Sequence, residues 1–120
     1  MASSLYKANA TVFLDACAAS TNATNVTTAA TEVFAVSAYN AAASVRFVKI
    51  YNKSSTPTVG TDIPIAVLAI PPSGFARLDW AKGMYMSTGL SYGIVTGAAN
   101  SNTTAPTASD VVSLTISYSL

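Results

Sequence analysis

The stretch from Ser44 to Pro72 alternates its side chains in a way that predicts two β-strands joined by a polar loop. Val48 and Ile50 share one face of the first run and Phe47 lies on the other, which is the period of two of a pleated strand. The second run, residues 65–70, is also apolar on both faces. Such strands must be covered on both sides, by a second sheet on one side and by a loop, an arm or another subunit on the other.

Shorter runs with the same period, separated by Gly, Pro, Asn and Ser, predict the rest of the sheet structure. In the run 32–40, Phe34, Val36 and Ala38 share a face, and a turn is expected at 82–83. The C-terminal strand has the clearest alternation, with one apolar face: Val112, Leu114, Ile116, Tyr118 and Leu120. The further strands expected are Ala10–Ala16, Val26–Ala30, Glu32–Asn40, Phe75–Trp80, Met84–Ser87, Ser91–Thr96 and Val112–Leu120.

Seven to nine short strands without an amphipathic helix predict an all-β fold, an antiparallel β-sandwich of jelly-roll or immunoglobulin-like topology. A chain of 120 residues has room for one such core, which we expect in residues 10–120. Residues 1–9 contain few bulky apolar side chains and are expected to form an extended N-terminal arm that docks on a partner.

The composition favours contacts between subunits over contacts with lipid or nucleic acid. Charged residues make up 9% of the chain and apolar ones 51%, and no apolar run reaches the length of a membrane span. The net charge of +1 comes from scattered side chains and gives no basic patch for nucleic acid. The N-terminus has no apolar segment of secretory length, so synthesis in a cytoplasm is expected.

The chain contains no histidine, which excludes His-dependent triads, Cys–His pairs and His-ligated metal sites. Two acidic arrangements stay open, a carboxylate pair of Asp62 with Asp79 and a calcium site of Asp62 with loop carbonyls, but acids in loops are more often solvated or capping groups. Cys17, the only cysteine, is expected to be an inert small side chain. The sequence therefore predicts no catalytic residue, no metal ligand and no cofactor.

Aromatic and methionine side chains supply the candidate interaction residues. One interpretation is a sugar-stacking platform, and the other is that these residues belong to the core and to interfaces. The platform would use Tyr39, Tyr51, Trp80, Tyr85 and Tyr92. Flexible Met and amphipathic Tyr are favoured at protein interfaces. The candidate interface residues are Leu5, Tyr6, Trp80, Met84, Tyr85 and Met86.

Three segments carry a resemblance to known proteins: SAYNAAASVRFVKIYNK, PTVGTDIP at 57–64, and YGIVTG at 92–97 with the later Asp110-Val111. From about Val33 to the C-terminus the chain resembles small all-β structural proteins of tailed bacteriophages. The resemblance implies a virion component made in the host cytoplasm, most plausibly a decoration or cement protein on the capsid exterior. It brings no catalytic residues with it.

The partners expected from this resemblance are the major capsid protein and further copies of the chain, in a homo-oligomer that we take to be a trimer. The arm or loops would contact the capsid, and apolar burial would supply binding energy that is insensitive to salt. The alternative is a tail or fibre component, or a carbohydrate-binding module that recognises a host surface through Trp80 and neighbouring tyrosines.

Overall fold

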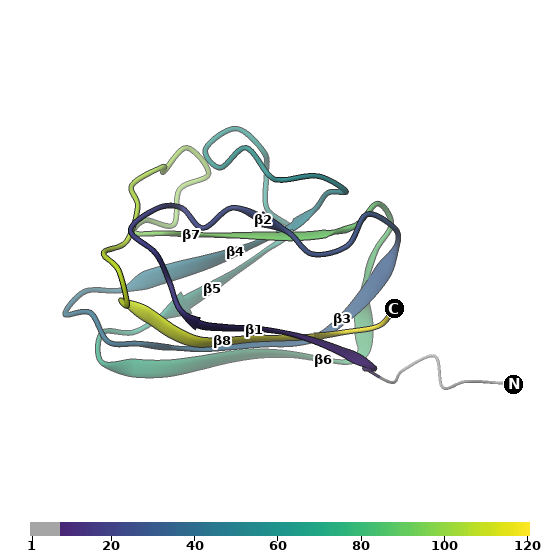
Figure 1. The fold of residues 1–120 in the computed structure, drawn as a ribbon, viewed down its shortest axis with the longest axis horizontal. Helices are drawn as coiled ribbons and strands as arrows, with labels where there is room; N and C mark the ends of the chain where they lie inside the picture. The colour runs from purple at the N-terminus through teal and green to yellow at the C-terminus, as the bar shows by residue number, and fades with distance from the viewer. Residues whose placement is uncertain (1–7) are drawn as a thin grey trace, which may run out of the picture.

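The computed structural model describes residues 8–120, in which eight β-strands and no helix form two stacked sheets (Figure 1). The first sheet has the order β1-β8-β3-β6 and the second β2-β7-β4-β5, with all neighbours antiparallel. The predicted antiparallel sandwich is confirmed. The strands are β1 (Ala10–Ala16), β2 (Thr24–Asn25), β3 (Thr31–Asn40), β4 (Arg46–Asn52), β5 (Ala66–Ile70), β6 (Gly74–Met86), β7 (Leu90–Val95) and β8 (Val111–Tyr118).

The pairing of the strands identifies the topology. β1 pairs with β8, β2 with β7, β3 with β6 and β4 with β5, as though the eight strands formed one long antiparallel hairpin. This hairpin is rolled up, because β8 also pairs with β3 and β7 also pairs with β4. Eight strands rolled in this way form a jelly roll, so of the two topologies that the sequence left open, this is the one adopted.

The core fills the space between the two sheets with aliphatic side chains from nearly every strand. Ile116 of β8 is completely buried, and its directly opposite neighbours in the first sheet are Val12 and Val36. From the second sheet, Val48 and Ile94 form a directly opposite pair that is also completely buried. The inward faces predicted for these strands by alternation are therefore correct over most of their length.

An irregularity where β3 meets β6 corrects two predictions. Val33 pairs with Met84 but Ala35 pairs with Asp79, so several residues of β6 lie opposite Phe34 alone. Gly83 lies within this segment with a φ of 85°, a left-handed conformation that glycine adopts without strain. The chain therefore continues as one strand through the turn expected at 82–83. The same shift buries Val33 completely and leaves Phe34 half-buried outside the core.

A second irregularity interrupts the last strand. Tyr39 pairs with Val112 but Ser37 pairs with Thr115, and Ser113 has a φ of 54°. The extra residue changes which side chains face inward, so that Val111 is completely buried. At the other end of the strand, Leu120 is 85% exposed, which corrects its placement on the apolar face. The strand expected at 26–30 is also wrong, because the pairing with β7 is limited to residues 24–25.

Two long connections cover the outer face of the second sheet, as Figure 1 shows above β7. They are residues 53–65, drawn in teal, and 96–110, drawn in yellow-green. An added Cβ on Gly93 would lie 2.8 Å from Val59 Cγ2, which shows how closely the first connection approaches the sheet. The second connection accepts a 2.6 Å hydrogen bond from Lys49 Nζ at Ala99 O. The sequence predicted that a loop, an arm or another subunit would cover the second face of the stretch 44–72. Over β4 this cover is formed by the two loops of the same chain.

Lys49 and Tyr51 lie beneath these loops, and neither is more than 1% exposed. Burial lowers the pKa of Lys49 from its ordinary value, because the charged ammonium is removed from water. Burial, followed by the negative charge of Asp62, raises the pKa of the Tyr51 hydroxyl. Within residues 8–120 the Lys49 ammonium meets the carbonyl dipole of Ala99 and forms no ion pair with a carboxylate.

Replacing Lys49 by methionine is expected to raise the free energy of unfolding at neutral pH by about 1–2 kcal/mol, because the cost of burying a charge exceeds the contribution of one hydrogen bond. The stability of the wild type is also expected to depend on pH through Lys49. Since the pKa of Lys49 is lower in the folded state, the unfolded chain binds more protons between the two pKa values, and the wild type gains stability as the pH rises through that window. The Lys49→Met variant should lack this alkaline gain. Urea unfolding at several pH values from neutral to alkaline measures both effects.

Lys53→Met is the matched control, since Lys53 is partly exposed and its Nζ lies 2.5 Å from Asp62 Oδ2. This variant is expected to lose stability by no more than about 1 kcal/mol. A Lys49→Met variant that is less stable than the wild type at every pH would show that the bond to Ala99 outweighs the burial of the charge.

Candidate interaction surface

The outer face of the first sheet presents large aromatic side chains to solvent. Phe13 of β1 is 62% exposed, and Phe75 of β6 is 60% exposed. Phe75 lies directly opposite Tyr39 of β3, which is itself exposed. Between these strands, Thr115 lies opposite both Phe13 and Ser37, so the centre of the face is built from small hydroxyl side chains. We call these five residues the aromatic face.

Charge on this side of the sheet is balanced locally. Arg77 and Asp79 follow Phe75 on the same face of β6, and the Arg77 Nε lies 2.8 Å from Asp79 Oδ1. Both side chains are more than half exposed, so the pair contributes little to stability. The pair adds no net charge beside Phe75, and the exposed Asp15 follows Phe13 on the outer side of β1. Such a surface suits a protein partner with apolar and neutral polar groups.

A hollow of about 360 Å³ adjoins the aromatic face. It lies where Ala8 passes over the first sheet and is lined by Ala8, Phe34, Ala35, Arg77, Asp79, Trp80, Ala81 and Ser117. The irregularity opposite Phe34 contributes to its shape, because it places the phenyl ring outside the core. Its lining combines the Arg77–Asp79 ion pair and the Ser117 hydroxyl with apolar side chains.

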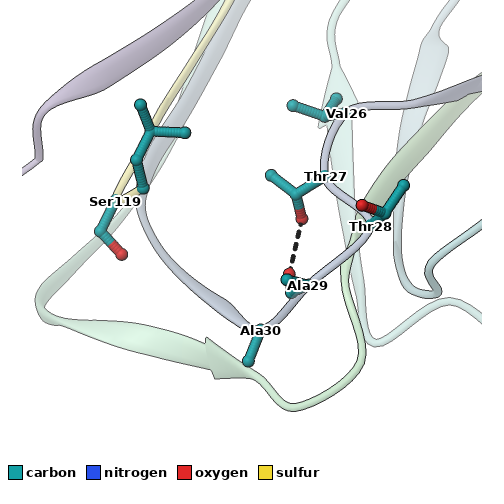
Figure 2. A pocket seen from close by; sticks show the side chains of 7 residues that line it. Val26, Thr27, Thr28, Ala29, Ala30 and Ser119 are labelled. Atoms are coloured by element: carbon teal, nitrogen blue, oxygen red, sulfur yellow. Dashed lines mark hydrogen bonds between the residues drawn. The ribbon is translucent and has the colours of Figure 1, made fainter.

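A second hollow, of about 300 Å³, lies between residues 26–30 and the end of the chain (Figure 2). The Thr27 hydroxyl there donates a 2.9 Å hydrogen bond to the Ala29 carbonyl and accepts one from the Leu90 amide. Both hydrogen bonds of this hydroxyl are therefore made within the protein, where they stabilise the loop. None of the side chains that line the hollow is charged: Val26, Thr27, Thr28, Ala29, Ala30, Ser119 and Leu120. It offers methyl groups and neutral hydroxyls.

The candidate interface residues of β6 are not all accessible. Tyr85 is 65% exposed and is available to a partner. Trp80 and Met84 are partly buried and pack against the core, while Met86 is completely buried within it. The structure therefore corrects the prediction for Met86, which shares the inward side of β6 with Ala76 and Leu78. The remaining two candidates, Leu5 and Tyr6, lie outside the described residues.

The proposed sugar platform is also dispersed. Tyr92 is buried in the core and Tyr51 lies under the loops of the second sheet. Tyr39 lies on the first sheet opposite Phe75, whereas Tyr85 lies near the far end of β6 opposite Glu32. The five aromatic residues thus share no single surface. The exposed aromatic group that the structure does show uses Phe13 and Phe75, which the sequence marks only as large apolar residues on the otherwise polar faces of alternating strands.

The acidic residues form separate local contacts. Asp62 accepts hydrogen bonds from Lys53 Nζ at 2.5 Å and from the Thr58 amide at 2.7 Å, and these two donors lower the pKa of its carboxyl group. Asp79 lies on the other sheet with Arg77, so the carboxylate pair of Asp62 and Asp79 is not formed. Within residues 8–120 no three side chains of the metal-binding types come together. Cys17 is buried and accepts a 3.3 Å hydrogen bond from the Val111 amide.

Comparisons with protein-family models, with curated proteins and with solved structures gave no match to this chain. No helix in the described part of the chain has the length and apolarity that crossing a bilayer requires.

Proposed function

We propose that this chain is a non-enzymatic structural protein of a bacteriophage virion, a decoration protein that stabilises the head by binding across neighbouring capsid subunits. The observation that carries the proposal is the aromatic face, where two phenylalanines that are each at least 60% exposed flank a floor of small hydroxyl side chains. Exposed phenylalanine costs solubility unless a partner covers it. An exposed sheet face of this kind matches a protein surface better than it matches a small ligand.

Two further observations support the proposal. The jelly roll recurs in viral capsid domains and in lectins, which is an analogy of fold. The resemblance of residues 33–120 to phage structural proteins rests on strand and turn motifs, which in the structure lie in β3, β4, β7, the start of β8 and the loop after β4. A decoration protein of this type acts by buried area, and the aromatic face supplies apolar area without net charge.

Replacing Phe13 by lysine is expected to weaken binding to capsids by more than about tenfold, because a few large side chains carry most of the energy of an interface. The stability of the isolated protein should change by no more than about 0.5 kcal/mol, since the side chain is exposed. Co-sedimentation of purified variants with undecorated heads measures the binding.

Thr61→Lys is the control, because Thr61 is an exposed residue of the loop on the opposite sheet. Equal binding of the Phe13→Lys variant and the wild type would exclude the aromatic face as the contact surface. Cryo-electron microscopy of the particle that carries this chain provides the wider test. Density in many symmetric copies on the head agrees with decoration, whereas density confined to the tail or fibres would replace it with a role in host recognition.

A further inference from the structure

β5 is an edge strand whose outer side is exposed and apolar. It pairs with β4 on one side and is the last strand of the second sheet. Val67 is 37% exposed, and the residues that lead into the strand, Ile63 and Ile65, are 73% and 45% exposed. The two loops that cover Lys49 and Tyr51 on β4 thus leave this row of aliphatic side chains in contact with solvent.

The other three edges of the sandwich carry the protections that natural edge strands use. β2 is only two residues long, and β1 carries the exposed Asp15. β6 carries Arg77, Asp79 and Lys82 and is distorted at Gly83. The segment from residue 63 to residue 76, which contains β5, has no charged residue at all. An apolar edge without charged residues, on a sandwich whose other edges are short or charged, is typical of a surface that is covered by another strand.

We infer that the β5 edge pairs antiparallel with the β5 edge of a second copy of this chain, which joins the two second sheets into one continuous sheet of eight strands. Antiparallel pairing of identical strands is self-complementary, since each copy offers the same donors and acceptors around a twofold axis. A charged edge would place like charges opposite each other in such a pair, and this edge has none. Pro64 and Pro71 flank the free edge and limit pairing to residues 65–70.

The charged side chains nearest to the edge are either buried or paired. Lys49, directly opposite Val67 on β4, is completely buried and donates its hydrogen bond to Ala99 O. Arg46 on the adjacent strand forms an ion pair with Asp110 at 2.9 Å, and Lys53 forms one with Asp62 at 2.5 Å. A second copy would therefore meet aliphatic side chains and backbone groups, with little charge to desolvate. This contact is isologous, so it closes as a dimer, and the trimer expected from the resemblance would require a different surface. The inference does not depend on the proposed role in a virion.

Sedimentation velocity and light scattering on the full chain test this inference. The wild type is expected to be a dimer. Val67→Lys and Val67→Glu should each be monomeric, because two like charges would face each other across the twofold axis. An equimolar mixture of the two variants should recover the dimer, since opposite charges then meet. If either variant were monomeric because it had unfolded, mixing the two would not restore the dimer.

A monomeric wild type, or single variants that stay dimeric, would overturn the inference. If the wild type is monomeric and the Val67→Lys variant no longer binds capsids, the β5 edge pairs with a strand of another protein instead. Phe13→Lys separates the two proposals: it should keep the dimer whether or not it loses capsid binding, because Phe13 lies on the other sheet.

Discussion

Replacing Ile116 by alanine is expected to lower the free energy of unfolding by about 2–5 kcal/mol, the range found when large aliphatic residues are removed from a packed core. Ile116 is completely buried in β8, and its opposite neighbours Val12 and Val36 belong to the two flanking strands. A cavity there would reduce packing in three strands of the first sheet together. Since domains of this size are stable by roughly 5–15 kcal/mol, the loss is a large part of the total.

Thr115→Ala is the matched control, because Thr115 is the adjacent residue on the outer face and is only partly buried. It should cost less than about 1 kcal/mol. Chemical denaturation followed by the fluorescence of Trp80, the single tryptophan, measures both variants. Similar losses for the two substitutions would contradict the inward direction that the structure gives Ile116.

Replacing Gly89 by alanine is expected to cost about 3 kcal/mol, because the added methyl group would collide with backbone on more than one side. The Cβ would lie 2.6 Å from the Thr27 carbonyl oxygen, 2.8 Å from the Lys53 carbonyl oxygen and 2.9 Å from the Ser54 Cα. Backbone atoms of two different loops would have to move, and the Gly89 carbonyl also accepts a hydrogen bond from the Lys53 amide. The measurement is again denaturant unfolding, with the wild type alongside.

Gly97→Ala supplies the comparison, since the atoms nearest to its Cβ belong to the Asn102 side chain, which can turn away. Its cost should stay below about 1 kcal/mol. If Gly89→Ala were as stable as Gly97→Ala, the segments around Thr27 and Lys53 would be more adaptable than their close approach to Gly89 indicates.

Alternation of apolar and polar residues predicted most strands because a sandwich buries one face of each strand. It predicted β1 with its exact bounds, Ala10–Ala16, and with Phe13 on the face opposite Val12 and Leu14. It failed where the chain inserts extra residues into a pair. Counting by twos assumes regular pairing, so a bulge at Ser113 is enough to move Val111 into the core.

The candidate surface was harder to predict, because it depends on which strands become neighbours. Phe13 and Phe75 lie 62 positions apart in the chain, and the sequence gives no sign that the order β1-β8-β3-β6 places them on one face. The aromatic residues that the sequence did group, such as Tyr51 and Tyr92, are separated by burial under a loop and in the core. Composition predicts that apolar surface is exposed, and topology decides where that surface lies.

The rolled hairpin also has a consequence for how fast the chain folds. β1 is synthesised well before β8, which is the one strand that it pairs with among residues 8–120. Every pair except β4 with β5 joins segments that are far apart in the chain, and closing such long loops places the domain among the slow, millisecond-to-second folders. Since β4 and β5 form the pair with the shortest connection, we expect them to pair early, which would present the β5 edge to other chains before the sandwich closes.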